Sequence, residues 1–292
     1  MQKNTGIMSA RKPQSRNETS WRLLPFRVLR AAENMAVDEA VFRLNRRKAL
    51  SPTLRFFGWK PPAVSLGYFQ KTSREIDVET CQREGIDIVR RPTGGKAVLH
   101  EHELTYSLVA TVDHPLFTGD ILETYRVISS CIVEALKRFG LAPEMVSEGR
   151  SAAGTPLEAY CFAAPSKYEL LVGGRKICGS AQVRGGGAFL QHGSLLIDVD
   201  PSRAAAVMRV PAAGISGSTT TLREQLGRVI GADELARVLR GAFEDTLGIT
   251  FAEDGLTAAE DSLKERLLDE KYDTDRWNLE GKSTPDGQGE PP

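Results

Sequence analysis

The sequence is poor in cysteine and has no long apolar run. Its cysteines form no C-x-x-C pair, which argues against a disulfide framework and a structural zinc site. They are Cys81, Cys131, Cys161 and Cys178. No apolar stretch approaches the roughly 20 residues that a membrane helix needs, and the polar first residues do not resemble a signal peptide. We therefore expect reduced thiols in a cytoplasmic protein without a membrane partner.

The sequence also carries no formal net charge at pH 7. The 292 residues include 38 Lys and Arg and 38 Asp and Glu. A balanced charge produces no field that would draw the protein to nucleic acid or to an anionic membrane, so neither is an expected partner. The length is sufficient to bury the core of one large domain or two small ones, and no internal repeat is visible.

Amphipathic helices are predicted where apolar residues recur three and four positions apart. These ranges are 34–48, 78–84, 119–140, 202–209, 221–230, 233–246 and 257–271. β-Branched and aromatic runs predict strands at 21–24, 53–57, 63–68, 86–90, 104–110 and in much of 166–200. Because helices and strands are mixed rather than strictly alternating, the pattern favours an α+β fold with a mixed, largely antiparallel sheet flanked by helices.

Composition divides the chain into four parts. Residues 1–18 are polar without periodicity, and residues 281–292 are rich in Gly, Pro and Ser, so a disordered arm and a disordered tail are predicted. Between them we expect a main folded domain over 19–252 and a C-terminal helical segment over 253–280.

Two short loops bear on how the strands are arranged. The proline pair 61–62 separates the predicted strands 53–57 and 63–68, and we expect a tight loop joining them. The glycine pair 94–95 lies between arginines and Lys96. Glycine lets a backbone turn tightly or approach a ligand closely, so a plain hairpin turn and a ligand-binding loop are both open here.

Histidine and glutamate alternate over residues 100–103. Such side chains can bind a metal ion, but an H-x-H pair with loosely placed acids is common at solvated loop edges. We expect no metal site.

Thiol chemistry is suggested by one β-rich segment, which holds Cys161, Lys176, Cys178 and His192. A thiolate is a strong nucleophile toward a thioester, and a nearby cation favours the thiolate. Cys161 and Lys176 lie fifteen positions apart, far enough for a strand pair to bring them together. Cys178 follows Lys176 by two positions and is expected on the same face. From the residues alone, a buried structural cysteine remains the commoner outcome for Cys161.

Several motifs together resemble the biotin/lipoate protein ligase and lipoyl/octanoyl transferase superfamily over residues 21–277. The motifs are residues 34–40, 54–59, 65–70, 90–100 and 179–182. Within this superfamily, His100 followed by Glu-Leu-Thr-Tyr-Ser at 103–107, together with Cys-Phe-Ala-Ala-Pro-Ser at 161–166, is most similar to the cysteine-dependent octanoyltransferases. The resemblance implies the ligase-like α+β catalytic domain for 19–252.

The resemblance also implies roles for individual residues. Cys161 would form an acyl thioester, and Lys176 would hold the acyl carbonyl and favour the thiolate. The implied substrate-binding residues are Arg91, Thr93, Gly94, Gly95, Lys96, His100, Ser180, Ala181, His192, Gly193 and Ser194. A structural hydrogen bond is an equal alternative for His192. Val98 and Leu99 are candidates for lining the acyl chain.

The implied reaction belongs to lipoate biosynthesis. Octanoate would move from acyl carrier protein to a lysine of a lipoyl domain, such as the glycine cleavage H protein, without a cofactor or a metal. Three alternatives stay open. An ATP-dependent lipoate ligase needs no cysteine but tends to carry an Asn-Asp-Leu-type stretch where this chain has residues 166–170. An amidotransferase that moves octanoate between two lipoyl domains also uses a cysteine, and a binding module would form no covalent adduct.

Overall fold

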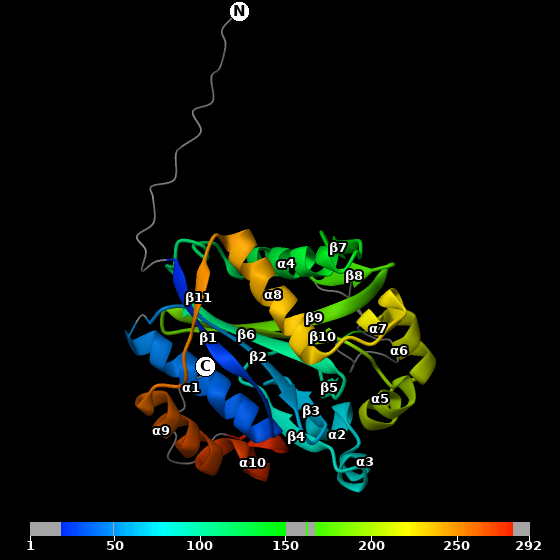
Figure 1. The fold of residues 1–292 in the computed structure, drawn as a ribbon. Helices are drawn as coiled ribbons and strands as arrows, with labels where there is room; N and C mark the ends of the chain where they lie inside the picture. The colour runs from blue at the N-terminus through cyan, green and yellow to red at the C-terminus, as the bar shows by residue number, and fades with distance from the viewer. Residues whose placement is uncertain (1–18, 49, 150–161, 163–166, 283–292) are drawn as a thin grey trace, which may run out of the picture.

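The computed structural model describes residues 19–48, 50–149, 162 and 167–282, and an eight-stranded sheet runs through its centre (Figure 1). The strand order is β11 (Thr250–Glu253), β1 (Ser20–Leu29), β2 (Thr53–Trp59), β6 (Glu103–Thr111), β10 (Ala188–Leu196), β9 (Arg175–Gly185), β8 (Leu170–Val172) and β7 (Pro143–Met145). β1 pairs in parallel with β11 and β2, and the remaining pairs are antiparallel. The predicted α+β class with a mixed, largely antiparallel sheet is confirmed.

A second sheet of three strands tests two of the local predictions and contradicts one. Its order is β4 (Asp87–Arg90), β3 (Ala63–Leu66) and β5 (Val98–His100). The two strands expected at 53–57 and 63–68, joined by a tight loop, are confirmed as β2 and β3, and the loop leads from the large sheet to the small one. The hairpin interpretation of the glycine pair is wrong, because β4 and β5 lie on opposite sides of β3, parallel and antiparallel to it.

Helices cover both faces of the large sheet, as Figure 1 shows. The helices are α1 (Ala31–Lys48), α2 (Thr72–Glu75), α3 (Val78–Arg83), α4 (Ile121–Arg138), α5 (Pro201–Met208), α6 (Ala212–Ser218), α7 (Leu222–Leu226), α8 (Ala232–Leu247), α9 (Ala258–Leu267), the π-helical turn η1 (Leu268–Tyr272) and α10 (Asp275–Asn278). On β6, Leu108 packs into the core cluster beneath α4 and α8, and Val109 packs into the cluster beneath α1. Because successive side chains of a β-strand point to opposite faces, β6 contributes residues to the core on each side of the sheet.

The predicted helices are largely confirmed, with different ends. The one predicted at 221–230 stops at Leu226, since Gly227 adopts a left-handed backbone with φ of 66°. The one predicted at 257–271 divides into α9 and η1. None of the helices in the described part of the chain combines the length and apolar character that crossing a bilayer requires.

Arg90 fastens the C-terminal helices to the loop after β3. Its side chain is fully buried and donates hydrogen bonds to the carbonyls of Gly67, Gln70, Trp277 and Asn278. A buried guanidinium without carbonyl or carboxylate partners would be costly, so each of these bonds restrains the loop. The C-terminal helices therefore help to position this loop, in which Gly67 packs against Gly94 and Gly95.

Candidate active site

A small cavity of about 30 Å³ lies where the two sheets meet. It is lined by Met35, Trp59, Arg91, Val98, His100, Thr105, Gly179, Ser180, Ala181, His192, Gly193 and Ser194. Seven of these residues belong to the substrate-binding set that the sequence predicted, and they come from segments more than a hundred residues apart. The structure therefore brings seven of the eleven predicted substrate-binding residues together around one cavity.

The pairing of β9 with β10 sets the floor of the cavity. Ser180 lies opposite Gly193, and Ala181 lies opposite His192. A Cβ atom on Gly193 would lie 2.4 Å from Oγ of Ser180 and 2.7 Å from Cε1 of Tyr106, which is closer than real Cβ contacts. Only glycine fits at this position without displacing its neighbours.

The glycine loop meets the cavity only at its ends. Arg91 and Val98 line the cavity, whereas the predicted Thr93, Gly94, Gly95 and Lys96 do not. Gly95 has a φ of 93°, which favours glycine, and its carbonyl lies against Gly67 so closely that a Cβ on Gly67 would be 2.0 Å from the oxygen. Arg91 holds the loop by donating through Nη2 to the carbonyls of Gly94 and Lys96, both at 3.0 Å. The guanidinium thus has a structural task in addition to facing the cavity.

His100 is held by partners on both ring nitrogens. Nη1 of Arg91 donates to Oγ of Ser65 at 2.6 Å, which leaves the serine hydroxyl hydrogen for Nε2 of His100, also at 2.6 Å. Nδ1 of His100 then donates to the carboxylate of Glu103 at 2.6 Å. The same carboxylate oxygen accepts from Ser194 at 2.8 Å. These bonds fix the ring that forms the polar wall of the cavity.

His192 belongs to a second buried network. Its Nε2 lies 2.7 Å from Oγ1 of Thr93, and its Nδ1 lies 3.3 Å from Oδ2 of Asp38. Asp38 in turn pairs with buried Arg55 at 2.9 Å, and Arg55 also binds Asn34. Burial lowers the pKa of His192, and the hydrogen bond to Asp38 offsets only part of this effect. The imidazole is therefore neutral near neutral pH.

Lys176 lies apart from this cavity. Its ammonium pairs with Glu169 at 2.7 Å, and the two side chains are only 2% and 5% exposed. The ammonium also lies 5.1 Å from the ring centre of Phe162. Cys161 lies outside the described residues, and Phe162 is its immediate neighbour in the chain.

Cys178 is not on the face that the sequence predicted. A β-bulge shifts the register so that Lys176 lies opposite Leu171 and Cys178 opposite Leu170. Because Leu170 and Leu171 point to opposite faces of β8, Lys176 and Cys178 do so too. Cys178 packs in the large core, where burial raises its pKa to about 12.

Several buried polar residues around the site were not predicted: Asp38, Arg55, Ser65, Glu103 and Glu169. Asp38 and Glu103 lie within the stretches that carry the resemblance, where charges amid apolar neighbours were an available signal. Glu169 lies in the stretch 166–170, where no motif marked it as a site residue.

The alternating residues 100–103 do not converge. Their side chains turn to different partners: Glu101 pairs with Arg203, His100 binds Glu103, and His102 is largely exposed. In the described ranges, no three His, Cys, Asp or Glu side chains are grouped so that they could hold a metal ion.

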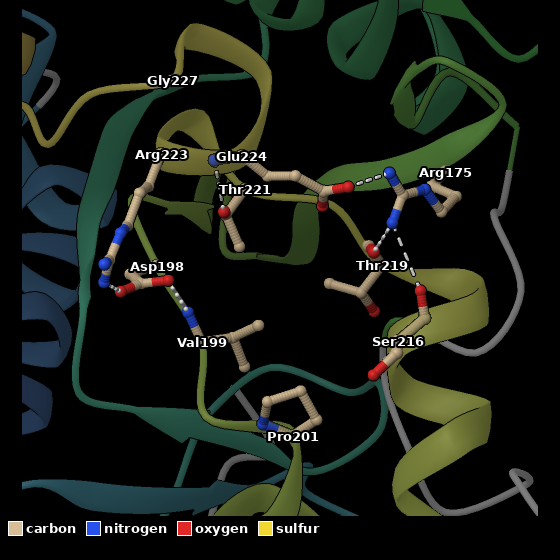
Figure 2. Close-up of a pocket in the computed structure, with 10 residues that line it drawn as sticks. All are labelled: Arg175, Asp198, Val199, Pro201, Ser216, Thr219, Thr221, Arg223, Glu224 and Gly227. Atoms are coloured by element: carbon tan, nitrogen blue, oxygen red, sulfur yellow. Dashed lines mark hydrogen bonds and ion pairs between the residues drawn. The ribbon is translucent and has the colours of Figure 1, made fainter.

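A larger cavity of about 520 Å³ lies near the start of β9 (Figure 2). Ion pairs cross its rim: Arg175 binds Glu224, and Arg223 binds Asp198 at 2.6 Å. None of the predicted site residues lines it, although Arg175 directly precedes Lys176. Positive and negative side chains balance there, so it has no evident preference for an ion of either sign.

Comparison with known proteins identifies the family. A model of the lipoyl protein ligase A/B catalytic domain matches residues 30–244. Octanoyltransferase LipM of Kyrpidia tusciae is 41% identical over 270 residues, covering 89% of this chain and 98% of the relative. LipM of Symbiobacterium thermophilum is 40% identical, covering 90% and 99%. A bi-partite lipoate protein ligase from Thermoplasma acidophilum is 28% identical, with a TM-score of 0.76 over 91% of this chain and 98% of that one.

Fold and site together thus define an enzyme built on the lipoate protein ligase scaffold. Within that superfamily, the chain belongs to the octanoyltransferase family, and it is a transferase.

Proposed function

We propose that this enzyme moves an octanoyl group from octanoyl-acyl carrier protein to a lysine of a lipoyl domain, such as the glycine cleavage H protein. Cys161 carries the group between the two partners as a thioester. The relatives named octanoyltransferase support the acyl group. The archaeal ligase, described with its E2 lipoyl domain, supports the class of acceptor.

The observation that carries the proposal is the buried ammonium of Lys176 beside Phe162. Because Phe162 directly follows Cys161, the ammonium lies against the residue next to the cysteine in the chain. A neighbouring cation favours the thiolate, which is the reactive form toward a thioester. The same ammonium is suited to stabilise negative charge on the acyl carbonyl oxygen as it is attacked.

Two acyl transfers complete the reaction. The Cys161 thiolate attacks the carbonyl carbon of the donor thioester, the donor carbon–sulfur bond breaks, and the donor sulfur leaves and takes a proton. The amine of the acceptor lysine then attacks the new thioester, and an amide forms. The cysteine sulfur leaves and the amine proton is released, which restores the enzyme. The predicted substrate-binding residues around the cavity would contact the acyl chain during both steps, and the cavity of about 30 Å³, which has room for about two waters, would have to widen to admit the chain.

The alternatives differ in the donor that they require. We would supply an unmodified lipoyl domain with octanoyl-acyl carrier protein, with a second octanoylated lipoyl domain, or with free octanoate and ATP. We expect rapid acylation from the first donor alone, abolished in Cys161→Ser. Faster transfer from the octanoylated lipoyl domain would identify an amidotransferase. Transfer that requires ATP would identify a ligase, and no transfer from any donor would leave a binding module.

A further inference from the structure

We propose that Phe69, with Lys71 and Arg74 beside it, is the docking point for an acidic protein that delivers the acyl group, namely the acyl carrier protein. This inference rests on the proposed function, because it names the surface that receives the proposed donor. Phe69 is 87% exposed, the highest value among the large apolar side chains that the structure describes. Covering such a ring is favourable, and aromatic side chains are enriched in the buried centres of protein interfaces.

The turn that presents Phe69 is held firmly. It spans residues 67–70 between β3 and α2 (Figure 1), and it is closed by a hydrogen bond from the amide of Gln70 to the carbonyl of Gly67 at 3.1 Å. The amide of Gly67 donates in return to the side chain of Gln70 at 2.8 Å. Buried Arg90 donates to the carbonyls of both residues, at 3.0 and 2.7 Å. A side chain presented by a fixed backbone loses less conformational freedom when a partner binds.

The charge beside the turn is positive. Lys71 and Arg74 are exposed, and neither side chain pairs with a carboxylate in the part of the chain that the structure describes. The nearest acids along the chain are less available, since Glu75 is half-buried and Asp77 already pairs with an arginine at 3.1 Å. Cations without a partner attract an acidic protein and steer its approach.

The turn lies one loop away from the cavity. Gly67 packs against Gly95, and a Cβ on Gly95 would lie 3.6 Å from Cβ of Ala181, which lines the cavity. A carrier protein holds its thioester on a long prosthetic arm, so its body can dock beside the cavity while the acyl chain reaches in. An acceptor lysine has a short stem and a positive charge, so its domain must dock directly over the cavity. The position and the charge of the turn therefore favour the donor as the occupant.

The test compares two donors that carry the same acyl group, octanoyl-acyl carrier protein and the small thioester octanoyl-pantetheine. Phe69→Ala should raise KM for the carrier protein about tenfold, while kcat, KM for the lipoyl domain and kcat/KM for octanoyl-pantetheine stay within about twofold of wild type. Val229→Ala is the matched control, because it truncates another exposed apolar side chain, and it should behave as wild type with both donors. Denaturant titration should show that both variants fold as wild type does.

Charge reversal tests the two cations separately from the ring. Lys71→Glu with Arg74→Glu should raise KM for octanoyl-acyl carrier protein at low salt, and the difference from wild type should shrink as added salt screens the charges. A salt-independent KM difference, or none, would contradict the part assigned to the cations.

Three results with Phe69→Ala would overturn the proposal. The first is an unchanged KM for octanoyl-acyl carrier protein. The second is an equal loss with octanoyl-pantetheine, which would mean that the turn shapes the cavity. The third is a loss confined to the lipoyl domain, which would make the acceptor the occupant. A wild type that accepts no acyl group from octanoyl-acyl carrier protein would instead refute the proposed function, and this inference with it.

Discussion

Nε2 of His192 lies 2.7 Å from Oγ1 of Thr93, although 99 positions separate them in the chain. This contact joins β10 to the glycine loop, and the 3.3 Å contact from Nδ1 to Asp38 joins both to α1. A neutral imidazole satisfies the arrangement when Nδ1 carries the hydrogen and Nε2 accepts from the threonine hydroxyl. The histidine is therefore a structural link between three elements as well as a wall of the cavity.

The lowered pKa of His192 makes stability depend on pH. Burial keeps this imidazole neutral in the folded state, whereas the unfolded chain takes up a proton below about pH 6.5. The unfolded state then holds more protons, so the free energy of unfolding falls as pH decreases, by at most about 1.4 kcal/mol per pH unit for this group. Urea titrations between pH 5 and 7.5 should show a smaller slope in His192→Gln. His102→Gln, at an exposed position, should keep the wild-type slope; equal slopes in all three proteins would contradict the assignment.

Three of the four cysteines should resist alkylation. Burial raises the pKa of Cys178 to about 12 and that of Cys81 to about 11, and it raises the pKa of Cys131 as well. Each unit lowers the thiolate fraction tenfold, and the thiolate is the reactive form. Iodoacetamide at neutral pH should therefore modify Cys161 first, with loss of acyl loading in proportion. Labelling of Cys178 at a similar rate would contradict this result.

Gly193→Ala should damage the cavity floor. The added Cβ would meet Oγ of Ser180 at 2.4 Å and backbone at 2.8 Å, so the strands must shift, and we expect a loss of about 1–3 kcal/mol in the free energy of unfolding. Gly217→Ala is the matched control, because a Cβ there meets nothing within 4 Å. It should change stability by less than about 1 kcal/mol. Denaturant titration compares the two variants; equal effects would mean that β9 and β10 are not tightly apposed.

Donor length should matter if the cavity holds the acyl chain. Burying a methylene is worth about 0.8 kcal/mol, so hexanoyl, which is two methylenes shorter than octanoyl, should transfer roughly 15-fold less efficiently. Val98 lines the cavity, so Val98→Phe should shift the preference toward the shorter donor. Val229→Phe, at a position that is 64% exposed, should leave the preference unchanged. Equal kcat/KM values for hexanoyl, octanoyl and decanoyl donors would contradict this use of the cavity.

Local patterns in the sequence predicted the helices and the fold class, because the spacing of apolar residues within one helix or strand shows which face is buried. The separation of 53–57 and 63–68 into two sheets was missed, since strand pairing depends on contacts distant in the chain. The motifs identified seven of the cavity residues. No motif pointed to Glu169, whose ion pair with Lys176 is found only in the structure. The β-bulge that places Cys178 and Lys176 on opposite faces could not be predicted, because the order of apolar and polar residues in this strand does not indicate it.

The central claim is that Cys161 carries the acyl group, and intact mass spectrometry tests it most directly. After incubation with octanoyl-acyl carrier protein, wild type should gain the mass of one octanoyl group, and hydroxylamine should remove it. Cys178→Ser should gain the same labile group, and Cys161→Ser should gain none that hydroxylamine removes. A labile adduct that persists in Cys161→Ala would contradict the claim and assign the nucleophile to another residue.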